Sequence, residues 1–180
     1  MLLRVLRQVV AIAVLPFTVL VLIPLYLARR NAVAPGVGVG LSQVLVQLGG
    51  LILLAVGGAL FAASLRCFAG EGRGTLAPWD PPIRLVVRGP YRYVRNPMIS
   101  GVAFLLFGEA ALLLSVPHLR WAVIFVLVNA LYIPLFEEPG LARKFGDEYR
   151  AYRRHVPRLL PRLRPWVPGA GAPDREAVET

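Results

Sequence analysis

Two long stretches without charge constrain the fold of this chain more than any other feature. The first covers residues 9–28, twenty consecutive uncharged residues between Arg7 and Arg29. A helix of that length extends about 30 Å, which is the thickness of the hydrocarbon core of a bilayer. The second uncharged stretch covers residues 41–65. Both stretches predict transmembrane helices.

The first stretch has one competing interpretation, a cleaved secretory signal. Ala32-Val33-Ala34 has the small residues of a cleavage site. However, the apolar region is longer than the roughly 7–15 residues usual in such signals, and Pro35 follows the would-be cut. We therefore expect the first helix to remain in the mature protein.

The composition agrees with a membrane protein. Hydrophobic residues make up 57% of the 180 residues, and the mean hydropathy is +0.62, whereas soluble domains contain about 45–50% apolar residues. The length fits one domain. We expect a single integral membrane domain over residues 1–165 and a disordered tail over residues 166–180, where hydrophobic periodicity is lacking.

Two further apolar helices are expected in the second half of the chain. The first runs from about Met98 to Ser115 and carries Glu109. The second covers residues 121–136, with a kink near Pro134. Pro117-His118-Leu119-Arg120 is predicted to form the tight turn between them. The expected fold class is therefore all-α, a polytopic membrane helical bundle of about four transmembrane helices.

Small and acidic residues inside these helices indicate how the bundle packs. Glycines at positions 49, 50, 57 and 58 recur at heptad spacing, and small residues let helices approach closely in lipid. An acid such as Glu109 is costly inside a spanning helix and usually faces a polar interior. Glu109 is therefore a candidate proton acceptor, or else a hydrogen-bond partner in packing.

The chain is strongly basic, with 20 Lys and Arg residues against 10 Asp and Glu and a net charge of +10. Nucleic-acid binding is one explanation of such a charge. The distribution favours another, because with four spans 17 of the basic residues fall on one side and three on the other. Positive residues collect in cytoplasmic loops. We therefore expect no nucleic-acid partner, and place both termini and residues 66–97 in the cytoplasm, at the inner membrane of a bacterium.

A further helix is predicted beyond the last span. It follows Glu137-Glu138-Pro139, and Pro139 suits the first turn of a helix. Apolar and aromatic residues then recur at helical spacing, at positions 141, 145, 149 and 152. These features predict an amphipathic cytoplasmic helix, ended by Pro157 and Pro161, whose cations would also be attracted to anionic lipids.

Metal and disulfide chemistry receive no support from the sequence. Cys67 is the single cysteine, and His118 and His155 lie far apart along the chain. A disulfide within the chain is therefore impossible, and no metal site is predicted.

Polar residues that could form a site are concentrated in two segments. Residues 85–101 supply arginines and tyrosines, and residues 137–152 supply a carboxylate pair. Both segments are predicted to be cytoplasmic, and the helical hairpin between them brings their ends together at the membrane face. A pocket between them, open towards lipid, is therefore plausible.

Four sequence motifs carry a resemblance to a known family. They are Leu85-Val-Val-Arg-Gly-Pro-Tyr-Arg-Tyr-Val-Arg-Asn-Pro-Met98, Glu137-Glu-Pro139, Phe145-Gly-Asp-Glu-Tyr-Arg-Ala-Tyr152 and Val156-Pro-Arg-Leu-Leu-Pro161. In this order they resemble the isoprenylcysteine carboxyl methyltransferase and phospholipid methyltransferase group of integral membrane enzymes. The resemblance covers roughly residues 70–162.

The resemblance implies S-adenosyl-L-methionine as cofactor, bound on the cytoplasmic side, and transfer of its methyl group to a lipid-like acceptor reached through the membrane. The implied cofactor contacts are Leu85, Val86, Tyr91, Asn96, Pro97, Met98, Ile99 and Glu137. The candidate catalytic residues beside them are Glu138, Arg95 and Glu109. The implied partners are membrane lipids and a lipophilic small molecule.

The chain departs from the carboxyl methyltransferases at three positions. Asn96 stands where they usually have His, Ile99 where they have Tyr, and Ile133 where they place an arginine for the substrate carboxylate. A prenylcysteine acceptor would therefore lack its obvious partner. The acceptor, O- or N-methylation and the oligomeric state are left open by the sequence.

Two other classes of function are consistent with parts of the pattern. A membrane reductase of related helical architecture would need a site for NADPH, and the short chain has no evident room for further helices. A non-catalytic membrane module would use the basic face to bind anionic lipids. Binding of S-adenosylmethionine or NADPH distinguishes the three classes.

Overall fold

The computed structural model describes residues 15–33, 35–71 and 85–167, and every regular element in these ranges is helical, which confirms the all-α class. The elements in chain order are η1 (Thr18–Leu22), α2 (Ile23–Arg30), α3 (Leu41–Glu71), η2 (Gly89–Arg92), α4 (Pro97–Leu112), α5 (Val116–Tyr132), η3 (Ile133–Glu137) and α6 (Glu138–His155). Of these, η2 is a 3-10 turn, and η1 and η3 are π-helical turns.

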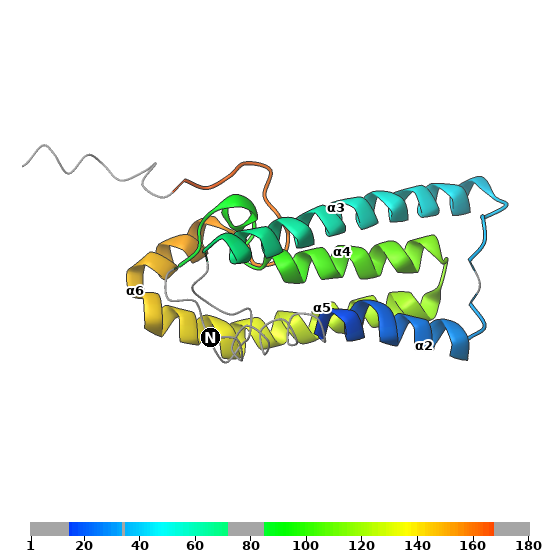
Figure 1. Ribbon diagram of the computed structural model, residues 1–180, viewed down its shortest axis with the longest axis horizontal. Helices are drawn as coiled ribbons and strands as arrows, with labels where there is room; N and C mark the ends of the chain where they lie inside the picture. Colours follow the sequence, from blue (N-terminus) through cyan, green and yellow to red (C-terminus); the bar gives the residue numbers. More distant parts are fainter. Residues whose placement is uncertain (1–14, 34, 72–84, 168–180) are drawn as a thin grey trace, which may run out of the picture.

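The long helices form an elongated bundle with two different ends. Figure 1 shows α4 beside α3 and α2 beside α5, with α4 and α5 joined by a short turn. That turn and residues 35–40 lie at one end of the bundle. The opposite end holds η2, α6 and the segment that follows α6. The two segments predicted to form a site are therefore at the same end.

Glycines allow α3 and α4 to pack with their backbones almost in contact. A Cβ built on Gly57 would lie 2.8 Å from the carbonyl oxygen of Gly101, and one built on Gly108 would lie 2.9 Å from the carbonyl oxygen of Gly50. These separations are below van der Waals contact. The expected role of small residues is thus confirmed for Gly50 and Gly57, and α4 supplies matching glycines at the same spacing of seven.

The other two glycines of the heptad pattern do not take part. A Cβ on Gly49 or Gly58 would meet open space. Neighbouring positions on a helix point about 100° apart, so Gly49 and Gly58 face away from α4 when Gly50 and Gly57 face it.

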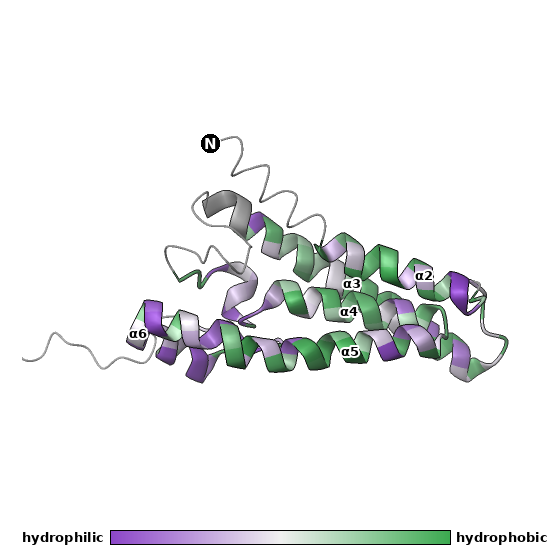
Figure 2. Cartoon of the chain, turned by 90° about the horizontal axis from the view of Figure 1, so that it is seen from below, coloured by the Kyte–Doolittle hydropathy of each residue, from purple (hydrophilic) through white to green (hydrophobic). Residues whose placement is uncertain are grey.

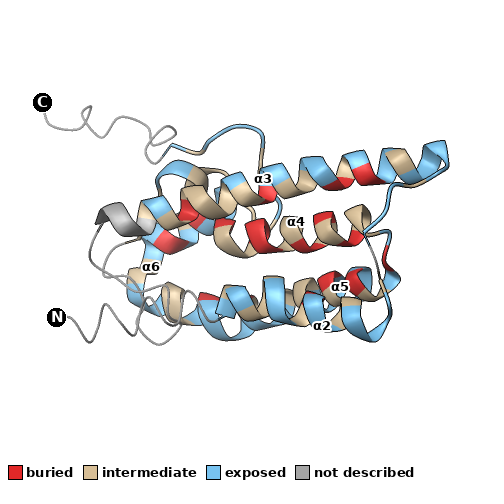
Figure 3. Ribbon diagram, turned by 45° about the vertical axis from the view of Figure 1, so that its right-hand side comes forward, coloured by how far each residue is buried: buried red, intermediate tan, exposed pale blue. Residues whose placement is uncertain are grey.

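The outer surface of the bundle is apolar. Figure 2 shows that hydrophobic residues dominate the long helices, and Figure 3 shows exposed residues along their outward faces. Exposed leucines and isoleucines include Leu48, Ile52, Leu127 and Leu131. Two helices, Leu41–Cys67 and Val116–His155, are long and apolar enough to cross a membrane, and α4 is a shorter apolar helix. Lipid is the solvent that such a surface fits.

The second of these helices is longer than a bilayer is thick. Its apolar part ends at Phe136, and Glu137 and Glu138 follow. From Val116 to Phe136 the rise is about 30 Å, which matches the hydrocarbon core. We therefore treat residues 116–136 as the spanning part and α6 as lying outside the hydrocarbon.

The turn between the third and fourth helices lies earlier than predicted. Residues 117–120 are helical, and the chain reverses at residues 113–115, where Leu114 has a φ of 49°. Pro117 is in the first turn of α5. A proline there loses no helical hydrogen bond, because the first amide groups of a helix have no intrahelical acceptor. The prediction that Pro117 belongs to the turn was therefore wrong.

Three other boundaries differ from the prediction. Helix α3 continues to Glu71 instead of ending near residue 65, and α4 ends at Leu112. At Pro134 the expected kink is the π-helical turn η3, through which α5 runs directly into α6. Residues 1–14, which include the start of the first predicted helix, and the predicted tail from residue 168 lie outside the described residues.

Candidate functional site

Local sequence explains how the chain turns into α4. Gly89 has a φ of +51°, and a Cβ at this position would lie 2.9 Å from Sγ of Cys67 on α3. Glycine meets both requirements, since it tolerates positive φ and has no Cβ. Pro90 is the second residue of η2, and Pro97 occupies the first turn of α4 after Asn96. The segment between the two prolines, residues 91–96, is here called the basic turn. It is thereby held against the end of the bundle.

The segment after α6, residues 156–166, is here called the C-terminal strap. It runs beside residues 92–96 and is joined to them by four backbone hydrogen bonds. These bonds run from Arg95 N to Pro157 O (2.8 Å), from Asn96 N to Arg158 O (3.2 Å), from Arg162 N to Tyr93 O (3.0 Å) and from Trp166 N to Arg92 O (2.9 Å). Ser100 in α4 also donates its hydroxyl to the carbonyl of Leu159, at 2.6 Å. The strap therefore fixes the turn that leads into α4.

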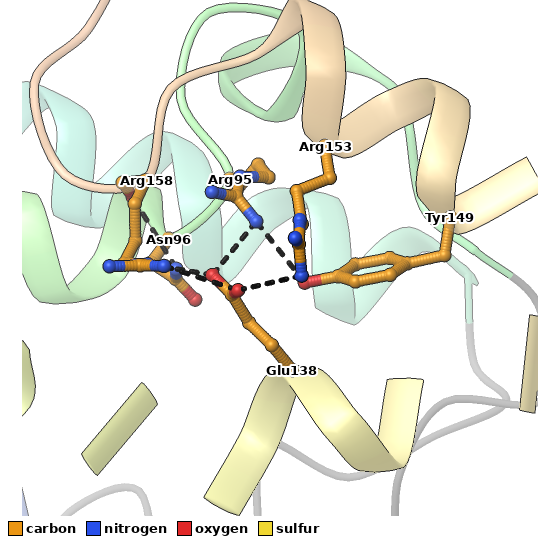
Figure 4. A network of polar contacts seen from close by, with 6 residues as sticks. All are labelled: Arg95, Asn96, Glu138, Tyr149, Arg153 and Arg158. Atoms are coloured by element: carbon orange, nitrogen blue, oxygen red, sulfur yellow. Dashed lines mark hydrogen bonds and ion pairs between the residues drawn. The ribbon is translucent and has the colours of Figure 1, made fainter. Parts of the chain in front are cut away.

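Glu138 is the centre of a buried ion network at this end of the bundle (Figure 4). Arg158 donates from Nε to Oε1 at 2.6 Å and from Nη2 to Oε2 at 3.2 Å. Arg95 donates from Nη1 to Oε1 at 2.8 Å, and the same nitrogen is 3.3 Å from the Tyr149 hydroxyl. Arg153 lies further away, with Nη1 3.6 Å from Oε2. The network joins three parts of the chain: the turn before α4, helix α6 and the strap.

Electrostatics keep the Glu138 carboxyl ionised. Its side chain is only 4% exposed, and burial acts to raise its pKa. The hydrogen bond from Arg158 and the charges of Arg95, Arg158 and Arg153 outweigh burial, so the pKa of Glu138 is lowered. The same hydrogen bond raises the pKa of Arg158. Such pairing is what allows a carboxylate to be buried at all.

An aromatic cluster lies beside the ion network. Tyr149, Tyr152 and Val156 are buried together, and Leu85 and Trp166 pack against them. The Tyr152 hydroxyl donates to the backbone carbonyl of Tyr91, at 2.6 Å. Burial raises the pKa of Tyr152, so its hydroxyl remains a neutral donor. The cluster therefore attaches residues 85–91 to α6.

Three of the residues predicted to contact a cofactor touch these two clusters, namely Leu85, Tyr91 and Asn96. Leu85, Val86, Tyr91 and Asn96 are half-buried, Pro97 is buried, and Met98 and Ile99 are half-buried in the first turn of α4. Glu137 is exposed, and it makes no hydrogen bond or ion pair with another described residue. The carboxylate pair thus has one buried, paired member and one available member.

The predicted catalytic residues fall into two groups. Arg95 and Glu138 are bonded to each other in the network, but Glu109 lies twelve residues beyond Pro97 on α4, which is about 18 Å along the helix axis. Its Oε2 atom is buried and has no hydrogen-bond partner among the described residues. The structure therefore does not bring Glu109 to the network.

Sequence reasoning did not single out Arg158, Tyr149 or Trp166 as parts of the site. Trp166 was assigned to the tail, yet its ring stacks on His155 with centroids 5.4 Å apart. Arg158 lay within a quoted motif, between two prolines that end α6. A buried carboxylate needs cationic partners, and Arg158 could have been proposed on that ground.

Comparison with known proteins identifies the family. The sequence model for phospholipid methyltransferase matches residues 45–148, which is more than half of the chain. The matched region contains most of α3, the basic turn, the α4–α5 hairpin and both members of the carboxylate pair. No solved structure matched the chain.

Several curated proteins are similar over part of the chain. Methanethiol S-methyltransferase 2 of Bradyrhizobium diazoefficiens is 42% identical over 76 residues, which are 41% of this chain and 27% of that protein. Methanethiol S-methyltransferase of Pseudomonas deceptionensis is 39% identical over 77 residues, again 41% of this chain and 27% of that protein. The matched parts thus span about a quarter of the length of these relatives. On the family match over residues 45–148, the chain belongs to the phospholipid methyltransferase family, a group of membrane methyltransferases.

Proposed function

We propose that this protein is an integral membrane methyltransferase that uses S-adenosylmethionine and acts on an acceptor dissolved in the membrane. The observation that carries the proposal is the family match over residues 45–148. The apolar outer surface of the bundle supports a membrane location, and an end rich in arginine and tyrosine supports a polar site at the membrane face.

The residues at this end fit the chemistry of S-adenosylmethionine. The methionine part of the cofactor carries an ammonium and a carboxylate, and the nucleoside part carries hydroxyls and a flat base. Glu137 offers a carboxylate to an ammonium or hydroxyl group, and Tyr91 offers an aromatic wall. Nε of Arg95 is buried without a hydrogen-bond partner among the described residues, on a side chain that is 9% exposed. A carboxylate is a ligand that would satisfy this donor.

For methyl transfer the main contribution of the protein is to position the reacting groups. Bound S-adenosylmethionine supplies a methyl group on a sulfonium that is its own leaving group. The chain contributes by holding the cofactor at the basic turn and by keeping water from the reacting atoms, and such alignment supplies much of the rate of a transfer reaction. Asn96, Pro97, Met98 and Ile99 form the turn that would line the cofactor, with Leu85 and Val86 beside it.

A thiol is the acceptor that the comparisons favour. The relatives named above are methanethiol S-methyltransferases, so a small lipophilic thiol is proposed ahead of an oxygen or nitrogen acceptor. A thiol must lose its proton to become a nucleophile. Glu138 is poorly suited to take the proton, because three arginines stabilise its ionised form. Water is better suited, since Glu137 is assigned to the cofactor.

The proposed orientation places the site in the cytoplasm of a bacterium. It rests on the unequal division of basic residues between the two ends of the bundle. Gly36→Cys and Leu163→Cys, each in a Cys67→Ser background, lie at opposite ends and are both exposed. We expect a membrane-impermeant maleimide to label position 36 in intact cells and position 163 only after permeabilisation. The reverse pattern would overturn the orientation.

Calorimetry of the purified protein in detergent tests the cofactor. We expect S-adenosylmethionine to bind and NADPH not to bind. Transfer of a radiolabelled methyl group to a small alkyl thiol, compared with an alkyl alcohol and an alkyl amine, then tests the acceptor. Binding of NADPH alone would favour the reductase, and binding of neither would leave the lipid-binding module.

A further inference from the structure

The C-terminal strap is attached to the candidate site more tightly than its position in the sequence suggests. It follows α6 and lies entirely beyond residues 45–148, the region that the family model matches. Nevertheless it bonds to the basic turn along its whole length, from Pro157 to Trp166. An interaction that fixes the position of the strap therefore also fixes the turn before α4.

Arg158 connects the two halves of the site through the strap, in addition to the direct bond between Arg95 and Glu138. Its backbone carbonyl accepts from the backbone N–H of Asn96 at 3.2 Å and from the Asn96 side-chain amide at 3.4 Å. Its guanidinium donates two hydrogen bonds to Glu138. Asn96 is on the side of the basic turn, and Glu138 is on the side of the carboxylate pair. Arg158 thus helps to set the distance between the basic turn and the carboxylate pair, the two segments proposed to hold the cofactor.

The other two arginines hold Glu138 less completely than Arg158 does. Arg95 bonds to a single oxygen of Glu138 through Nη1, which also lies within hydrogen-bond distance of the Tyr149 hydroxyl. Arg153 is 3.6 Å away, and its side chain is 58% exposed, so water screens its charge. Among the described residues, Arg158 alone contacts both carboxylate oxygens at hydrogen-bonding distance.

Glu138 is in turn the neighbour of Glu137. Glu138 is the first residue of α6, and Glu137 is the last residue of the π-helical turn η3. Anchoring the Glu138 side chain therefore fixes the backbone from which Glu137 projects. A π-helical turn interrupts the regular hydrogen bonding of a helix, so this backbone depends on such an anchor more than a regular helix would.

We propose that Arg158 is a positioning residue for methyl transfer, which sets the separation between the Asn96 turn and Glu137 by clamping Glu138 while its backbone holds Asn96. This inference rests on the proposed function. Arg158 acts through Asn96 and Glu138 and contacts neither the cofactor nor the acceptor.

Arg158→Gln and Arg158→Lys test the inference in the full-length protein, purified in detergent. Arg164→Gln is the matched control, because Arg164 is an exposed arginine of the same strap that makes no hydrogen bond or ion pair with another described residue. Measurements are the dissociation constant for S-adenosylmethionine, and kcat and KM for methyl transfer to a small thiol.

With Arg158→Gln we expect kcat at saturating S-adenosylmethionine to fall about tenfold or more, since charge-assisted hydrogen bonds of this kind are lost. Arg158→Lys keeps the charge but cannot bond both oxygens in the same geometry, so it should recover part of the loss. Arg164→Gln should match the parent. A merely structural role predicts instead a lower yield of folded protein with unchanged kcat per folded molecule.

Two outcomes separate the inference from the function on which it rests. If the parent protein neither binds S-adenosylmethionine nor transfers methyl groups, the proposed function fails. If the parent is active and Arg158→Gln equals Arg164→Gln in kcat, only the positioning role fails. Should Arg158→Gln not fold, Arg158→Lys decides, because a kcat equal to that of the parent would also overturn the positioning role.

Discussion

Gly57 and Gly101 face each other across the interface of α3 and α4, and a Cβ on Gly57 would lie 2.8 Å from the carbonyl oxygen of Gly101. The opposing atom is backbone and cannot rotate away. The glycine pair therefore sets the distance between the two helices. Because α4 carries the Asn96 turn at its start, this distance also helps to place the site.

Gly57→Ala is expected to destabilise the bundle, because the added methyl group forces α3 and α4 apart. Overpacking of this kind costs about 1–3 kcal/mol. Gly58→Ala is the control, since a Cβ there meets open space and alanine favours the helix more than glycine does. Thermal unfolding in detergent should show a lower Tm for Gly57→Ala and an equal or higher Tm for Gly58→Ala. Equal stability of the two variants would contradict the packing described.

Glu137→Gln is expected to weaken the binding of S-adenosylmethionine by roughly tenfold to a hundredfold. The change keeps the shape of the side chain but removes the charge, and hydrogen bonds to charged groups contribute about 1.5–3 kcal/mol. Glu148→Gln is the control, because Glu148 is an exposed glutamate on α6. Calorimetry gives both dissociation constants. If Glu137→Gln binds as tightly as the parent, Glu137 does not contact the cofactor.

Glu138 predicts a specific dependence of stability on pH. Burial acts to raise the pKa of Glu138 in the folded protein. The Arg158 hydrogen bond and the charges of Arg95, Arg158 and Arg153 outweigh burial, so the pKa is below the ordinary value of 4.5. A lowered pKa stabilises the folded state fully above the ordinary value, and this contribution is lost as pH falls below it. The arginines stay charged throughout this range, so Glu138 is the group in the network that titrates.

The measurement compares the parent with Glu138→Gln in thermal unfolding from neutral pH down to about pH 3, a range that spans the ordinary carboxyl pKa values. We expect the parent to be the more stable at neutral pH, and the difference to shrink as the solution becomes acidic. A difference that stays constant with pH would show that the ionised carboxylate adds nothing to stability.

Glu109→Gln tests whether this residue takes a proton during the reaction. Since Glu109 lies about 18 Å along α4 from the start of the helix, we expect kcat with a small thiol to stay within about twofold of the parent, which is a change below about 0.4 kcal/mol. The Oε2 atom of Glu109 is buried and has no hydrogen-bond partner within the described ranges, so replacing the carboxyl group should also leave Tm unchanged or raise it. A fall of tenfold or more in kcat would instead assign proton transfer to Glu109.

Part of this fold could be read from the sequence because it depends on local patterns. A long uncharged run predicted α3, two apolar runs predicted the α4–α5 hairpin, and the position of Pro139 predicted the start of α6. The motifs from Leu85 to Met98 and at Glu137-Glu138-Pro139 indicated the family and the end of the bundle at which the candidate site is proposed. These signals can be recognised in the sequence alone because hydrophobic runs, helix starts and short motifs involve residues that are close along the chain.

Other features were decided only by the tertiary structure. Pro117 suits both a turn and the first turn of a helix, so the sequence could not say where α5 begins. Heptad spacing did not distinguish Gly57 from Gly58, because the choice depends on which face meets α4.

The sequence analysis assigned Glu137 to the cofactor and Glu138 to catalysis, but it did not predict which of the two is buried and paired. Glu137 and Glu138 are adjacent and chemically identical, yet one is exposed and the other is clamped by Arg158, twenty residues further along the chain. An ion pair between distant residues has no periodicity and forms only once packing has brought its partners together. The sequence therefore determined which residues could form the site, and the tertiary structure determined which of them are bonded to each other and which remain available to a ligand.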